Sequence, residues 1–170
     1  MLRTAILVAG ALGILVLIVV AFGYALPVGH VASVDRAFGQ PPARVFAVIH
    51  DVERYPAWRS DVKQVQIVER TPALRWREVG SNGTITFEVQ EAVNPSRLVT
   101  RIADRSLPFG GTWMFVLTPE GSGTRVAITE HGEVYNPIFR VMSRFVFGHA
   151  ATMETFLGDL STYLGRAANQ

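Results

Sequence analysis

The C-terminal part of the chain, Asn136–Arg166, carries a long apolar stripe that another part of the chain must cover. Asn136 is a good helix cap, and Pro137 is well tolerated at the first helical position. Apolar side chains and one histidine then recur at steps of three and four, as on one face of an α-helix. These residues are Ile138, Met142, Phe145, His149, Met153, Phe156, Leu160 and Tyr163. We therefore expect an amphipathic helix of roughly 45 Å, interrupted at Gly148 and Gly158, with a sheet packed against its stripe.

The N-terminal part has no charged side chain from Thr4 to Gly29 and is continuously apolar over residues 5–25. About 20 such residues span a bilayer as a helix. The apolar stretch of a cleavable signal peptide is usually about 7–15 residues, although Gly23-Tyr24-Ala25 would fit a cleavage site. We expect an uncleaved anchor and linker over residues 1–29, followed by one domain over residues 30–170.

Charge and composition restrict the partners. Arg3 precedes the apolar run, which predicts a single-pass membrane protein with its N-terminus inside and its domain outside the cytoplasm. A net charge of +2 gives no electrostatic case for nucleic acid. Arg140 and Arg144 lie off the apolar stripe and are expected to face water. The absence of cysteine removes disulfides and thiolate chemistry.

Motifs for metals, cofactors and nucleophiles are absent from the sequence. No pair of histidines has the HExxH spacing, and no nucleophile elbow or phosphate-binding glycine loop is found. The sequence therefore predicts no metal and no cofactor, and no residue is assigned a catalytic role.

The pattern of apolar residues changes between the two terminal segments. It is first typical of a strand and two short helices, and then of strands with a two-residue repeat. Residues 31–38 are typical of a strand that ends before Pro41 and Pro42, and helical patterns follow as far as Trp58. From residue 65 apolar and polar side chains alternate, as in half-buried strands, and Asn82-Gly83 is a strong hairpin signal. The pattern predicts an α+β fold. Its order is one strand, two short helices, about six antiparallel strands and a long helix.

This order, with the phrases at residues 41–69 and 111–133, resembles a known family. Its most recognisable piece is a helix followed by Asp-x-x-x-Tyr-Pro-x-Trp, here Asp51, Tyr55, Pro56 and Trp58. The chain is similar to the polyketide cyclase/dehydrase and lipid-transport group of the START and birch-pollen-allergen (SRPBCC) superfamily. The resemblance implies a helix-grip fold, in which a curved antiparallel sheet wraps around the C-terminal helix and leaves an apolar cavity. Members bind lipids, sterols, polyketides and other hydrophobic ligands, and a minority are enzymes.

Large aromatic side chains from the sheet and the helix would converge in such a fold. They either fill the interior or line a pocket, and pockets for small molecules are mainly apolar with a few polar groups. The resemblance favours a pocket for a lipid, quinone or polyketide-like ligand, held between the sheet and the helix. The predicted ligand-binding residues are Trp58, Trp76, Glu78, Phe87, Thr100, Met114, Ile128, Glu130, Phe145, His149, Met153 and Phe156.

The pattern leaves two alternatives. A cyclase or dehydratase-type enzyme would use Glu78, Glu130 or His149, because burial raises a carboxyl pKa and an imidazole titrates near about pH 6.5. It requires at least two of them within hydrogen-bond reach, whereas the strand-end positions of both glutamates favour contact with water. A membrane-tethered protein-interaction module would instead expose an apolar patch, for example at residues 107–109.

Overall fold

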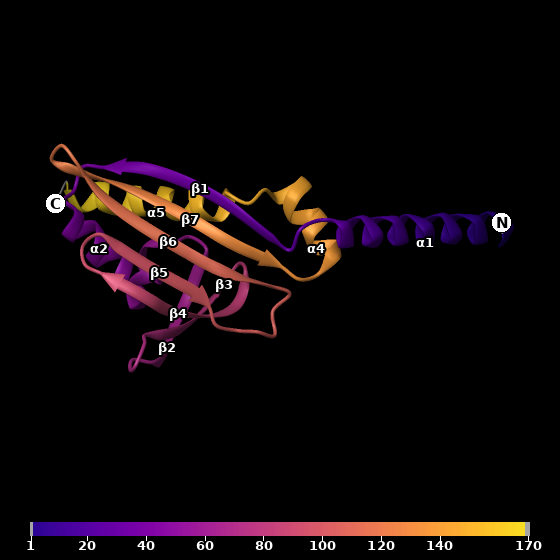
Figure 1. Ribbon diagram of the computed structural model, residues 1–170, viewed down its shortest axis with the longest axis horizontal. Helices are drawn as coiled ribbons and strands as arrows, with labels where there is room; N and C mark the ends of the chain where they lie inside the picture. The colour runs from indigo at the N-terminus through magenta and orange to yellow at the C-terminus, as the bar shows by residue number, and fades with distance from the viewer. Residues whose placement is uncertain (1, 169–170) are drawn as a thin grey trace.

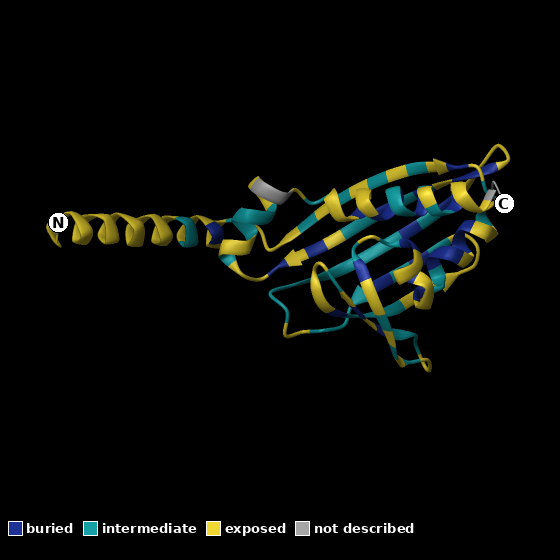
Figure 2. Cartoon of the chain, turned by 180° about the vertical axis from the view of Figure 1, so that it is seen from behind, coloured by how far each residue is buried: buried dark blue, intermediate teal, exposed yellow. Residues whose placement is uncertain are grey.

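The computed structural model describes residues 2–168, which form one long N-terminal helix and a domain of sheet and helices (Figure 1). Helix α1 (Leu2–Ala25) projects from one end of the domain and is almost entirely exposed (Figure 2). It is long and apolar enough to cross a membrane. Strand β1 begins at Gly29, so α1 and the sheet are separated by only three residues.

Seven antiparallel strands form one sheet in the order β1-β7-β6-β5-β4-β3-β2. Their bounds are β1 Gly29–Phe38, β2 Val62–Glu69, β3 Arg75–Gly80, β4 Gly83–Val93, β5 Arg97–Ile102, β6 Phe109–Glu120 and β7 Gly123–Val134. Strands β2 to β7 follow one another as neighbours, and β1 joins the free edge of β7. The alternation along β3, β5 and β7 puts Trp76, Leu98 and Ile128 in the interior.

Three short helical segments connect β1 to β2: α2 (Pro42–His50), η1 (Val52–Arg54) and α3 (Tyr55–Trp58). Pro42 begins α2, consistent with its fixed φ and missing N–H. The Tyr55 hydroxyl donates to the Ile49 carbonyl over 2.6 Å and joins the two α-helices from within the core. The sequence predicted both helices near these positions.

The C-terminal segment is broken into three parts: α4 (Pro137–Met142), the π-helical turn η2 (Ser143–Phe147) and α5 (Ala151–Ala168). The Asn136 side chain caps α4 by accepting from the N–H groups of Ile138 and Phe139, as predicted. The helix is interrupted at Gly148, as predicted, and the φ of this residue, 72°, lies in the left-handed region. The predicted interruption at Gly158 is wrong, because α5 runs through this residue. Of these three parts, α5 packs a buried apolar face against the sheet, whereas α4 contains no buried residue.

The interior behind the sheet is filled at one end by aromatic and aliphatic side chains. The ring of Phe156 on α5 lies 5.2 Å from that of Trp58 and 5.4 Å from that of Phe115. Met153 and Leu160 continue this buried face of α5. The curved antiparallel sheet around a C-terminal helix confirms the predicted helix-grip fold.

Candidate ligand-binding cavity

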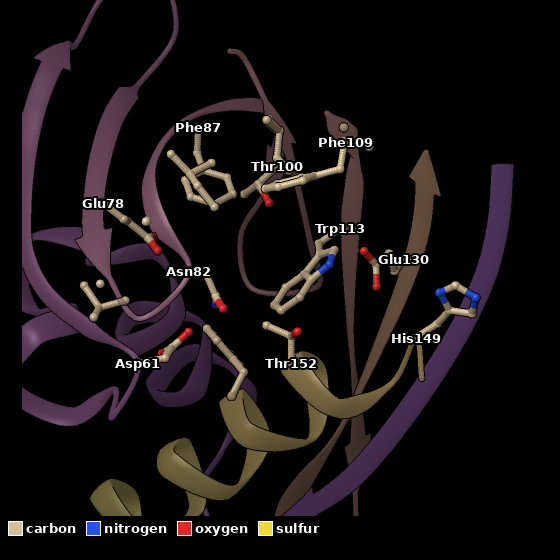
Figure 3. Close-up of a pocket in the computed structure, with 18 of the residues that line it drawn as sticks. Asp61, Glu78, Asn82, Phe87, Thr100, Phe109, Trp113, Glu130, His149 and Thr152 are labelled. Carbon is tan, nitrogen blue, oxygen red and sulfur yellow. The ribbon is translucent and has the colours of Figure 1, made fainter. Parts of the chain in front are cut away.

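A cavity of about 450 Å³ lies between the sheet, α5 and the segment before α5 (Figure 3). Its walls are mainly apolar and aromatic, with Trp113 and Phe87 from the sheet and Phe156 from α5. Its size is within the range of sites for drug-sized ligands. The interior is therefore filled at one end and open at the other.

Seven of the twelve residues predicted to bind a ligand line this cavity. They are Trp76, Glu78, Phe87, Thr100, Glu130, His149 and Phe156. The strand residues among them share the concave face because of the cross-strand register and the two-residue alternation along each strand. Trp76 is opposite Phe87, and Trp113 is opposite both Thr100 and Glu130.

The other five predicted residues do not line the cavity. Trp58, Ile128 and Met153 are buried in the filled part of the core. Met114 neighbours the cavity residue Trp113 along β6, so its side chain points to the opposite face. Phe145 is exposed on η2, with its ring 6.0 Å from that of Phe22 on α1.

One end of the cavity is held by a buried ionic cluster around Arg59. Its guanidinium donates to Asp61 through Nε and Nη2, over 3.0 and 2.7 Å, and Nη1 donates to both oxygens of Glu78 over 3.2 Å. The Trp76 indole N–H also donates to Glu78, over 2.8 Å. The guanidinium further lies 4.9 Å from the ring centre of Tyr55. The expectation that Glu78 reaches water is wrong, because its side chain is only 9% exposed.

This cluster holds two carboxylates and one cation. Burial raises the pKa of the Glu78 carboxyl, although Arg59 and the Trp76 N–H oppose the change. Burial disfavours the charged form of Arg59, but Glu78 and Asp61 outweigh it and raise the pKa of the guanidinium. Arg59 and Asp61 were not predicted, because nothing in the sequence pairs Arg59 with Glu78, 19 positions further along the chain.

The opposite end of the cavity is formed by two imidazoles and a carboxylate. The ring of His30 on β1 stacks on that of His149, with 3.7 Å between their centres. His30 Nε2 lies 4.0 Å from Glu130 Oε1, which is too far for a hydrogen bond. Trp113 is the register partner of Glu130 across β6 and β7. His30 was not predicted, and its separation from His149 in sequence hides the pair.

Burial acts on each of these three groups. It lowers the pKa of His30, and the charge of His149 lowers it further. It also lowers the pKa of His149, with Arg144 adding to the effect. Burial raises the pKa of the Glu130 carboxyl, while a hydrogen bond from Trp113 opposes the change. Both imidazoles are therefore mainly neutral near neutral pH.

Glu78 and Glu130 do not form a catalytic pair of carboxyls. Their strands, β3 and β7, are four positions apart in the sheet, about 19 Å along it at about 4.8 Å per strand. Figure 3 shows them on opposite sides of the cavity. Glu130 and His149 lie at the same end of the cavity, each next to His30. No hydrogen bond joins any two of Glu78, Glu130 and His149 among the described residues, so the requirement stated for an enzyme is not met in this structure.

Helix α4 lies against the C-terminal end of α1, beside cavity residues Phe139 and Ser143. Arg140 Nη1 donates to the carbonyls of Gly23 and Leu26, over 3.1 and 3.3 Å, and so satisfies free carbonyls at the end of α1. A side chain at Gly23 would collide with the main chain of Pro137, because a Cβ there would overlap the Pro137 carbonyl oxygen. The expectation that Arg140 faces water is therefore wrong.

Exposed apolar side chains gather on the same segment, including Ile138 and Phe139 on α4 and Phe145 on η2. Residues 107–109, where an exposed patch was predicted, are instead half-buried, and Phe109 lines the cavity. The exposed apolar surface of the domain thus continues from the end of α1 to the rim of the cavity.

Comparison with known proteins agrees with this architecture. The family model "Polyketide cyclase / dehydrase and lipid transport" matches residues 39–153. A search of curated proteins found no match. A crystal structure from Thermus thermophilus is 24% identical, with a TM-score of 0.69 over 81% of this chain and 99% of that one.

Two further solved structures have the same fold. A START superfamily protein from Mycobacterium smegmatis is 16% identical, with a TM-score of 0.65 over 81% of this chain and 99% of that one. The Zhui aromatase/cyclase from a Streptomyces species is 10% identical, with a TM-score of 0.66 over 82% and 96%. At these identities the likeness concerns the fold alone.

Proposed function

The chain belongs to the polyketide cyclase/dehydrase and lipid transport family, and from that premise we propose that it is a membrane-anchored protein that binds a hydrophobic small molecule. The observation that carries the proposal is the cavity between the sheet and α5, with its aromatic walls and few polar groups. A lipid, quinone or polyketide-like compound has the matching chemistry.

The contact between α1 and α4 supports an uncleaved anchor. Cleavage after Ala25 would remove Gly23, which packs against Pro137 and gives Arg140 one of its acceptors. The same contact brings the bilayer-spanning helix beside Phe139, which lines the cavity. Apolar compounds dissolve in the bilayer, so this rim is the natural place for them to enter the protein.

The test is to identify what the cavity carries when the full chain is purified from membranes. The protein is transferred to lipid nanodiscs, denatured, and its released small molecules are measured by mass spectrometry against empty nanodiscs. Thr152→Trp places an indole in the cavity, because Thr152 lines it from α5. Thr162→Trp is the matched control, since Thr162 is exposed on the same helix outside the lining.

We expect one hydrophobic compound to accompany the wild type and the control, and to fall by about tenfold or more in Thr152→Trp, equivalent to a loss of at least about 1.4 kcal/mol of binding free energy. Equal amounts in all three proteins, or none in the wild type, would contradict a ligand in this cavity.

A second candidate is a cyclase or dehydratase-type enzyme that acts on the same ligand. The placement of Glu130, His30 and His149 at one end of the cavity favours it, because carboxyl and imidazole groups beside a bound ligand can exchange protons with it. Its test is whether the extracted compound changes in mass or isomer composition on incubation with wild type but not with Glu130→Gln. An unchanged compound in both would leave binding without a reaction.

A further inference from the structure

Glu130 differs from the other buried carboxylates of the cavity in its partners. Glu78 and Asp61 are both paired with Arg59. Among residues 2–168, the only ionic contact of Glu130 is with His30 at 4.0 Å, and its side chain is 23% exposed. A carboxylate can accept about four hydrogen bonds, so Glu130 retains acceptor capacity toward the cavity.

The surroundings of Glu130 suit a cation. Trp113 lies beside it on the neighbouring strand and donates a hydrogen bond to the carboxylate, which leaves the other acceptor positions of Glu130 free toward the cavity (Figure 3). The neutral imidazoles of His30 and His149 each offer one nitrogen as an acceptor and place no full positive charge there.

The lining of the cavity as a whole is negatively charged. Its described side chains include the carboxylates Asp61, Glu78, Glu130 and Glu133 but only one cation, Arg59. Arg59 is already occupied by Asp61 and Glu78. An anionic head group would therefore be placed near unpaired negative charge and desolvated without a free cation to receive it, which is costly.

We propose that the ligand carries a protonated amine, which binds the Glu130 carboxylate while its apolar part lies against Phe87 and Phe156. This inference rests on the proposed function, since it assigns the ligand's polar group within the same cavity. It selects amines over alcohols of the same skeleton, and disfavours fatty acids and other carboxylates.

Three probes with one aromatic skeleton test the charge of the preferred group: phenylbutylamine, phenylbutanol and phenylbutyrate. Each is titrated by calorimetry into the full chain in phosphatidylcholine nanodiscs, with empty nanodiscs subtracting partition into lipid. We expect the amine to bind about tenfold or more tighter than the alcohol, as for a hydrogen bond to a charged group, and the carboxylate to bind most weakly.

Glu130→Gln keeps the shape of the side chain and removes its charge. It is expected to reduce the ratio of amine to alcohol affinity from about tenfold or more to about one. Glu91→Gln is the control for net charge, because Glu91 is exposed on β4 and pairs with Arg97 away from the cavity. The control is expected to keep the full preference.

Alcohol binding without a preference for the amine in the wild type would overturn the inference and leave the proposed function intact. The same holds if Glu130→Gln keeps the preference. Failure of all three probes to bind, together with no compound released from the purified protein, would overturn both. The comparison of probes on the wild type decides the question even if the variant does not fold.

Discussion

Arg59 is the residue on which the inner end of the cavity depends. Its side chain is 9% exposed and contacts two buried carboxylates, so removal of its charge leaves Asp61 and Glu78 facing each other without a cation. We expect Arg59→Met to lower the free energy of unfolding by about 3–5 kcal/mol, the usual cost of breaking a buried ion pair from one side. Denaturation followed by tryptophan fluorescence, with the full chain in detergent micelles, measures this loss.

Arg70→Met is the control for this experiment. Arg70 pairs with Glu53 at the surface, where both side chains are more than half exposed. Exposed pairs contribute little, so this variant is expected to unfold like the wild type. An equal effect of the two substitutions would show that the buried cluster has no special role in stability.

The stacked histidines predict a dependence of stability on pH. The pKa values of His30 and His149 are lowered in the folded protein, so below about pH 6.5 the unfolded chain binds more protons and stability falls with acidification. The raised pKa values of Glu78 and Glu130 act in the opposite sense, because the folded protein then binds more protons as pH falls toward about 4.5.

His149→Phe keeps a ring against His30 and removes one titrating group, while both carboxyls remain. We expect the loss of melting temperature between about pH 7.5 and 5.5 to be smaller in this variant than in the wild type. His131→Gln, an exposed substitution on β7, is expected to leave the pH profile unchanged. Parallel profiles for wild type and His149→Phe would contradict a role for the stacked pair.

Single positions on strands could be predicted where alternation alone decides the facing. Glu78, Thr100 and Glu130 were placed on the inner face in this way, and they line the cavity. Partners that meet only in three dimensions could not be predicted. His30 and His149 are 119 positions apart, and only the pairing of β1 with β7 brings His30 to the cavity.

At the scale of elements, the joint between α1 and α4 distinguishes this chain from a domain with a flexible tether. Gly23 makes close approach possible, because any Cβ there would meet the Pro137 main chain. Gly23→Leu is therefore expected to separate the two helices and to increase hydrogen exchange of the α4 amides, including Arg140 N, which donates to Asn136 O.

Gly13→Leu is the matched control, since a Cβ at Gly13 has nothing within 4 Å. It makes the same chemical change on α1 at a distance from the joint. Equal exchange in the two variants would mean that α4 does not depend on its contact with α1.

The repeat of three and four residues predicted one long helix, interrupted at two glycines, with its whole stripe packed against the sheet. Apolar periodicity does not reveal which partner a stripe meets. Met153 and Phe156 meet the sheet, whereas Phe145 meets Phe22 of α1. The change of partner occurs at Gly148, where the chain adopts a positive φ. The sequence predicted an interruption at this glycine. The reason for it is that the residues before Gly148 pack against α1 and those after it pack against the sheet.

At the scale of the whole molecule, the anchored form makes a direct prediction about processing. If α1 is retained, the protein recovered from membranes has the mass of the full chain and stays with the bilayer after alkaline extraction. Ala25→Leu is the matched variant, because cleavage sites need small residues. We expect each protein to have the mass of its own full-length chain. A shorter wild type with a full-length Ala25→Leu would identify α1 as a signal peptide.

The docking of Arg140 onto the last carbonyls of α1 also has a kinetic consequence for the proposed function. With the rim of the cavity held beside the spanning helix, a poorly water-soluble compound can find it by lateral diffusion in the plane of the membrane. The frequency of encounter then depends on how many such molecules occupy a unit of membrane area, and hardly at all on their concentration in water.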